Sequence, residues 1–203
     1  YDFINLAYTY IDMDSSRLAI KCLDSAIRVA IRTLGPKHRY IGVIYSQFSM
    51  LYFVDKDYQN ALAYSDSTVK IFKPLNEKGN TDYLQSAARL IVSQYKLGLN
   101  KSWKKDFENL LEECRSEFSE DELPFYFMIQ LYYAEALADN GDNKACLSLM
   151  REMIDFVKKE KNAKYGFYLQ SVLKIVQILE QIGEDNLAEE IKVKRDSFLN
   201  EQS

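Results

Sequence analysis

The chain has 203 residues, of which 47% are hydrophobic and 28% are charged, and this balance is typical of a folded domain rather than a disordered chain. Seven glycines and three prolines are too few for the many tight turns of an all-β fold, so helices joined by short loops are favoured. A net charge of −4 argues against general nucleic-acid binding, because such binding depends on lysines and arginines that displace counterions.

Helices are predicted in chain order at 2–12, 15–33, 38–54, 58–73, 81–97, 102–118, 123–140, 143–160, 165–182 and 184–200. Ser119 and Glu122 form a capping box ahead of Pro124, which predicts a helix start near Leu123. Prolines are expected to end the second and fourth helices. The two prolines are Pro36 and Pro74. The other predicted capping residues are Asp14 or Ser15, Asp57, Thr81 and Asp142.

A small residue opens an apolar helical face at Ala19, Ala61, Cys146 and Ala188, at intervals of 42, 85 and 42 residues. Since 85 is twice 42 plus one, a further unit is expected between the second and third of these. Trp103 and Lys104 stand where that unit should carry its small residue. We therefore expect five units, of which the third has lost its small residue.

A second motif is read upstream of each of these positions, against the pattern of a large residue, a small residue, two free positions and an aromatic residue. The copies are Leu6-Ala7 with Tyr10, Phe48-Ser49 with Tyr52, Ile91-Val92 with Tyr95, Tyr133-Ala134 with Leu137, and Ile175-Val176 with Leu179. A small residue lets the paired helix approach closely while large residues fill the remaining space. Neither helix of a pair can bury its apolar face alone, so the pattern predicts stacked pairs.

This pattern resembles the tetratricopeptide repeat family over nearly the whole chain. The 42-residue period and the connection 34–38, which reads Leu-Gly-Pro-Lys-His, are similar to the extended repeats of kinesin light chain and of bacterial arrays. The chain departs from the family pattern in two ways: none of the five units carries the tryptophan of that pattern at its position, and Ser65 and Lys192 stand where the second helix has a large apolar residue. The resemblance implies an all-α fold, a right-handed α-solenoid of about five antiparallel helix pairs.

The resemblance also implies one repeat domain over 1–203, with units at about 1–37, 38–80, 81–119, 120–163 and 164–203. Because the chain starts at Tyr1 without a charged and apolar leader, we expect a fragment of a longer protein. No apolar run reaches the roughly 18–20 residues that a membrane span needs, so no span is expected within this chain. The sequence does not decide the compartment: the cytoplasm is slightly favoured, and the periplasm is the alternative.

Catalytic motifs are lacking, since phosphate-binding glycine loops, zinc-protease signatures and nucleophile elbows do not occur. The single histidine, His38, lies in a predicted loop, where an exposed or capping role is favoured. Cys22, Cys114 and Cys146 are widely spaced, which favours buried reduced thiols over a metal or redox site. The sequence thus predicts no enzyme activity, no cofactor and no metal. Asn100-Lys101-Ser102 matches a glycan acceptor triplet, a motif that is common by chance.

In the tetratricopeptide family the first helices line a concave groove that binds protein or peptide partners. The resemblance therefore places a candidate partner-binding groove at Ile4, Tyr8, Ser46, Met50, Phe53, Arg89, Ser93, Lys96, Leu131, Glu135, Asp139 and Gln177. This surface would run from apolar and aromatic, through Arg89 and Lys96, to acidic. A peptide with an acidic centre would match it. The lysine and asparagine clamp for a terminal carboxylate is replaced by Ile4 and Tyr8.

The leading hypothesis is a non-catalytic module that binds a partner segment in this groove, with no direct nucleic-acid binding. A regulatory alternative is the sensory domain of a bacterial signalling or transcription regulator that receives a peptide or protein ligand. Self-association through an exposed terminal helix is a third hypothesis. Further repeats beyond the fragment would favour a scaffold, whereas a DNA-binding or kinase segment would favour regulation.

Overall fold

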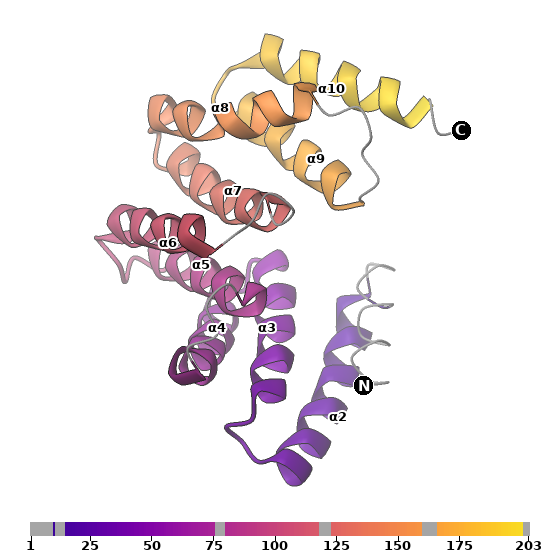
Figure 1. The fold of residues 1–203 in the computed structure, drawn as a ribbon, viewed down its shortest axis with the longest axis vertical. Helices are drawn as coiled ribbons and strands as arrows, with labels where there is room; N and C mark the ends of the chain where they lie inside the picture. Colours follow the sequence, from indigo (N-terminus) through magenta and orange to yellow (C-terminus); the bar gives the residue numbers. More distant parts are fainter. Residues whose placement is uncertain (1–9, 11–14, 76–79, 118–122, 160–165, 201–203) are drawn as a thin grey trace. The chain divides into compact units, whose positions relative to one another are not determined.

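The computed structural model describes residues 10, 15–75, 80–117, 123–159 and 166–200, and these ranges hold helices and no strand (Figure 1). Every helix begins and ends within one residue of its predicted bounds. The helix predicted at 2–12 and the capping box at Ser119 and Glu122 lie outside the described residues. The helices are α2 (Ser16–Leu34), α3 (Arg39–Val54), α4 (Tyr58–Phe72), α5 (Thr81–Lys96), α6 (Trp103–Glu117), α7 (Leu123–Asp139), α8 (Asn143–Lys159), α9 (Gly166–Gln181) and α10 (Asp185–Asn200), with a 3₁₀ turn η1 (Lys73–Leu75) after α4.

The chain divides into two compact units, Tyr1–Glu117 and Phe118–Ser203. In the first unit α3 packs against α2, α4 and α5, and α5 packs against α4 and α6. In the second unit α7 packs against α8 and α9, and α9 packs against α10. We call α3, α5, α7 and α9 the first helices and α2, α4, α6, α8 and α10 the second helices. Within each unit a first helix therefore contacts its own second helix and the next first helix, as in stacked pairs.

The turns between paired helices repeat one backbone conformation. Gly98, Gly141 and Gly183 have φ of 70°, 75° and 82°, and Lys56 takes the same place before α4 with φ of 59°. In each turn the next residue donates its backbone N–H to a carbonyl five residues back, at 2.8–2.9 Å. Glycine favours this left-handed conformation because a Cβ is strained there. Among the four described turns, the backbone is therefore strained only at Lys56, which is the one non-glycine residue in this conformation.

Capping residues fix several helix starts. Asp57 accepts the backbone N–H of Asn60 at 3.1 Å, as predicted, and the side chain of His38 accepts the backbone N–H of Tyr40 at 3.2 Å. The capping role of His38 is thus confirmed. The cap of α5 is Asn80, which accepts from the N–H of Tyr83 at 2.9 Å, so the prediction of Thr81 was wrong by one residue. Asparagine ranks above threonine as a cap.

The predicted register of small residues is confirmed, because Ala19, Ala61, Cys146 and Ala188 are all buried. Cys146 shows the close approach directly: its Sγ donates to the carbonyl of Ala134 on α7 at 3.3 Å. A small residue on each helix brings the backbones together at this point.

The third copy is regular, with Trp103 in the place of the small residue. Buried Trp103, Phe107, Leu110 and Cys114 follow the same spacing on α6 as four buried residues do on α4. The tryptophan fits because α6 begins at Trp103 itself, whereas the other second helices begin three residues before their small residue. Its ring packs on Tyr95, with centroids 4.6 Å apart.

Candidate partner-binding surface

The structure separates the predicted groove residues into exposed and buried sets, while Ile4 and Tyr8 lie outside the described residues. Lys96, Asp139 and Gln177 are exposed, and Met50, Phe53 and Glu135 are half-buried. We call these six residues the first-helix surface; three lie in each unit. The other four are interior side chains: Ser46, Arg89, Ser93 and Leu131 are 3%, 1%, 0% and 3% exposed.

Arg89 is held inside the first unit by hydroxyl groups. Its Nε donates to Ser49 Oγ at 2.9 Å, and one terminal nitrogen donates to Ser46 Oγ at 3.2 Å and to Ser86 Oγ at 3.1 Å. The same nitrogen lies 3.3 Å from the carbonyl oxygen of Ser46. Ser49 Oγ in turn lies 2.6 Å from Ser65 Oγ on α4. These contacts join α3, α4 and α5 in one buried polar network, which we call the Arg89 network.

Asp82, in the first turn of α5, lies close enough to Arg89 for electrostatic attraction. Burial raises the pKa of this carboxyl above its ordinary value, while a hydrogen bond with Ser46 and the charges of Arg89 and Arg39 oppose the rise. A buried arginine needs hydrogen bonds and a compensating charge to offset its lost hydration. The serines supply the hydrogen bonds, and Asp82 supplies the nearby carboxyl.

The expectation that Arg89 is an accessible groove cation is therefore corrected. Ser46, Arg89 and Leu131 occupy one repeat position, and all three side chains are buried; Arg89 lies against Ser46 and Ser49 of the neighbouring first helix α3. Leu173, the next member of that series, is 44% exposed. The departure at Ser65 is explained by the same network, because a large apolar side chain there would displace the hydroxyl that Ser49 contacts. Of the two predicted groove cations, Lys96 alone stays on the surface.

In the first unit, Lys96 lies among aromatic rings. Its Nζ is 5.9 Å from the ring centroids of both Tyr58 and Tyr95. Phe53 meets the ring of Tyr58 edge to face, with centroids 5.7 Å apart. Aromatic faces attract a cation and limit the positions it takes. The first unit therefore presents a positive charge on an aromatic base.

In the second unit, polar pairs connect α7 to α9. Lys174 Nζ lies 2.6 Å from Glu135 Oε1, and Gln181 donates to Asp139 at 2.9 Å. Gln177 lies on the same helix and is exposed. Because Glu135 and Asp139 already have partners within the chain, this part of the surface has mixed charge rather than the purely acidic character expected from the sequence.

Two of the three cysteine thiols are buried. Burial raises the pKa of the Cys114 thiol to about 12 and that of Cys146 to about 11, so both are protonated at neutral pH. Cys22 is half-buried. Among the described residues no group of histidine, cysteine, aspartate and glutamate could hold a metal ion. No helix of the described part is long and apolar enough to cross a membrane.

The glycan triplet lies in the turn between α5 and α6, where its asparagine has a structural role. Asn100 Nδ2 donates to Gln94 Oε1 at 3.2 Å and to Asp106 Oδ2 at 2.8 Å. Its Oδ1 accepts the backbone N–H of Ser102 at 2.8 Å. Since glycosylation would use the same nitrogen, the hydrogen bonds favour a turn-stabilising role for this side chain.

Comparison with known proteins identifies the fold. Two crystal structures of nearly identical TPR-like repeats, described as those of a Podosopora anserina kinesin light chain, match the entire chain. Their TM-scores are 0.68 and 0.66 at 16% identity, and the match covers 96% and 95% of those chains. No family model matches the sequence, and no curated protein matches it either. The chain therefore has a TPR-like helical-repeat fold, as the sequence predicted.

Proposed function

We propose that the chain is a non-catalytic interaction module that binds a protein or peptide through its first-helix surface. The observation that supports this most is the TPR-like repeat fold over the whole chain, because this architecture typically provides a scaffold for protein contacts.

The first-helix surface offers two different contacts. Lys96 with its aromatic base suits a carboxylate of the partner, which it would contact together with the half-buried Phe53. The second unit offers the exposed amide of Gln177 beside the Glu135–Lys174 pair. The contact in the first unit would suit an acidic group of a partner, and the contact in the second unit would suit polar groups.

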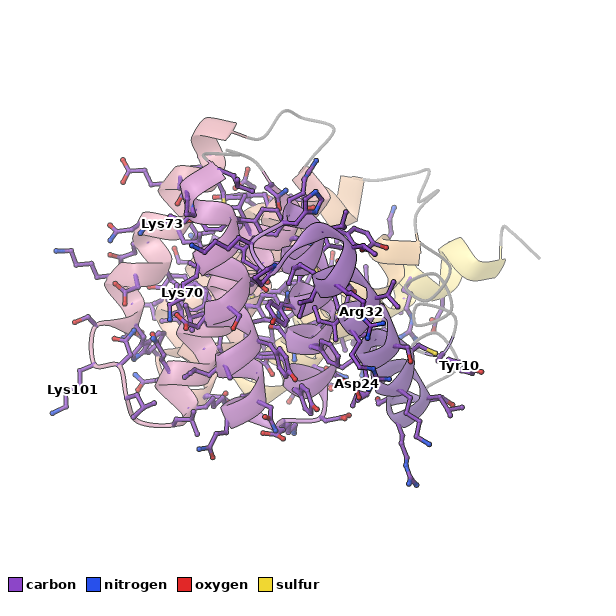
Figure 2. All side chains as sticks on the ribbon, turned by 90° about the horizontal axis from the view of Figure 1, so that it is seen from below. Tyr10, Asp24, Arg32, Lys70, Lys73 and Lys101 are labelled. Carbon is purple, nitrogen blue, oxygen red and sulfur yellow. The ribbon has the colours of Figure 1, made fainter. Side chains whose placement is uncertain are left out.

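Affinity capture from an extract of the source organism, using the immobilised 203-residue chain, tests this proposal. Lys96→Glu is expected to reduce recovery of the specific partner about tenfold, because it opposes the partner's carboxylate. Lys101→Glu is the matched control, since it makes the same charge change in the exposed turn after α5 (Figure 2). Equal recovery with wild type, Lys96→Glu and Lys101→Glu would reject the surface as the binding site.

A further inference from the structure

The side of α2 that faces solvent carries a line of four exposed cations. Because a helix turns by about 100° per residue, the four side chains fall within a sector about 60° wide, opposite the residues that α2 buries in the core. They are Arg17, Lys21, Arg28 and Arg32, and we call them the α2 stripe. The stripe extends from Arg17 to Arg32, a distance of about 22 Å along a helix.

Helix stability does not explain the α2 stripe. Arg17 with Lys21 and Arg28 with Arg32 are like-charge pairs four positions apart, a spacing at which like charges destabilise a helix. Arg17 also lies in the first turn, where the helix dipole disfavours a positive charge. Among the described residues no carboxylate forms an ion pair with any of the four, whereas α4 and α10 both carry ion-paired lysines. The stripe is therefore a positive surface that the described part of the chain does not neutralise.

The two edges of the α2 stripe differ in character. One edge carries Asp24, the single carboxylate on α2, which Figure 2 labels together with Arg32 of the stripe. Burial and then the charge of Asp24 raise the pKa of the Tyr52 phenol on α3, so this carboxylate lies toward the aromatic side of the unit. The opposite edge carries Leu18 and Val29, which are 42% and 54% exposed. Asp24 thus separates the stripe into two basic pairs, and apolar side chains border it on the other side.

We infer that the α2 stripe binds an acidic peptide segment of a partner protein, through a surface separate from Lys96. About seven extended residues span the stripe, with carboxylates on the two basic pairs, uncharged residues beside Asp24 and an aliphatic side chain near Val29. The whole chain carries −4, and α2 carries +3 from four cations and one aspartate, so the other residues carry −7. A membrane or a nucleic-acid duplex extends beyond the stripe and meets this repulsion, whereas a short segment meets the stripe alone. The inference rests on the proposed function of protein binding.

Fluorescence anisotropy of labelled peptides, titrated with the 203-residue chain, tests this inference. The first peptide has two pairs of glutamates separated by serine, leucine and serine; the second has lysines in place of the glutamates, and the third has the first composition with the four glutamates adjacent. The first is expected to bind, the third about fivefold more weakly, and the second at least about tenfold more weakly. Arg28→Glu with Arg32→Glu is expected to weaken the first peptide about tenfold. Lys144→Glu with Arg151→Glu, the same change at two exposed cations of α8, is the matched control and leaves it bound.

Further variants separate the α2 stripe from the first-helix surface. Lys96→Glu should leave the affinity for the first peptide unchanged, and loss of binding in this variant would place the peptide on the first-helix surface. If Lys96→Glu instead has no effect on partner capture, the first-helix surface is rejected and the result for the stripe stands. Absence of binding by the first peptide, equal binding of the second or third, or equal effects of the two double variants would overturn the inference. So would phosphatidylserine vesicles or a DNA duplex that displaces the first peptide from the chain.

Discussion

The two units solve the same packing problem with different side chains. Arg89 on α5 and Leu131 on α7 occupy one repeat position and are both buried. In the first unit the position is polar, and three serines accept hydrogen bonds from the guanidinium. In the second unit Leu131 is one of a run of buried apolar residues on α7, and the charged Glu135–Lys174 pair lies nearer the surface. The repeat therefore fixes where a side chain lies, and its neighbours decide which chemistry is tolerated there.

Charge reversal at Arg89 is expected to have the largest effect on stability, and it tests the buried polar environment of this position. Arg89→Glu would leave a buried carboxylate beside Asp82 and take the donors away from the serines. We expect a loss of about 4 kcal/mol in the free energy of unfolding, measured by urea denaturation. Lys96→Glu, on the same helix but exposed, should cost less than about 0.5 kcal/mol. Equal stability of the two variants would mean that Arg89 is accessible in solution.

Truncation at Leu131 probes the apolar version of the same position. Leu131→Ala removes buried methyl groups from α7, so we expect a cost of about 3 kcal/mol from lost burial and the cavity left behind. The loss should affect the second unit, which hydrogen exchange of α7 and α9 would report. Unchanged exchange in those helices would contradict the buried position of Leu131.

The helix bounds and the packing register were predictable from the sequence because they depend on short-range signals. Caps and prolines mark individual helix ends, and a small residue recurs in four of the five repeats at a spacing that fixes which face is buried. The burial of Arg89 depends on hydrogen bonds to Ser46 and Ser49, which lie about one repeat earlier in the chain. The position of Arg89 within the family pattern therefore led to the wrong prediction that its side chain is exposed. The available signal was the hydroxyl-bearing residue at Ser65, where the repeat pattern has a large apolar side chain.

A substitution in the turn before α4 is expected to stabilise the chain, by less than the two preceding variants destabilise it. Lys56 adopts φ of 59° where the corresponding turns of the second unit have Gly141 and Gly183. Lys56→Gly should therefore stabilise the chain by about 0.5–1 kcal/mol, since glycine removes the strain of a Cβ in this conformation. Thermal unfolding at one protein concentration would show a higher midpoint. A lower midpoint would indicate that the lysine side chain makes a stabilising contact.

The smallest expected effect is a change in stability with pH that comes from Asp82. The folded-state pKa of Asp82 is raised by burial, so the folded chain binds this proton more tightly than the unfolded chain does. The resulting stabilisation is present below the ordinary value near 3.8 and is lost as pH rises through the folded pKa. The Asp82→Asn variant does not lose this stabilisation as pH rises. The difference between its thermal unfolding midpoint and that of wild type should therefore increase in favour of the variant from acid to neutral pH. A constant difference would argue against a titrating Asp82 carboxyl beside the Arg89 network.

Nuclear magnetic resonance of the Arg89 side chain tests the stacking of first helices most directly. Arg89 Nε and Ser49 Oγ lie 2.9 Å apart although the residues are 40 positions apart in the chain. The account predicts a resolved Nε–H signal that exchanges slowly with water and shows a nuclear Overhauser effect to Ser49. An Arg89 signal that exchanges as fast as those of exposed Arg17 and Arg28, with no contact to Ser49, would contradict it.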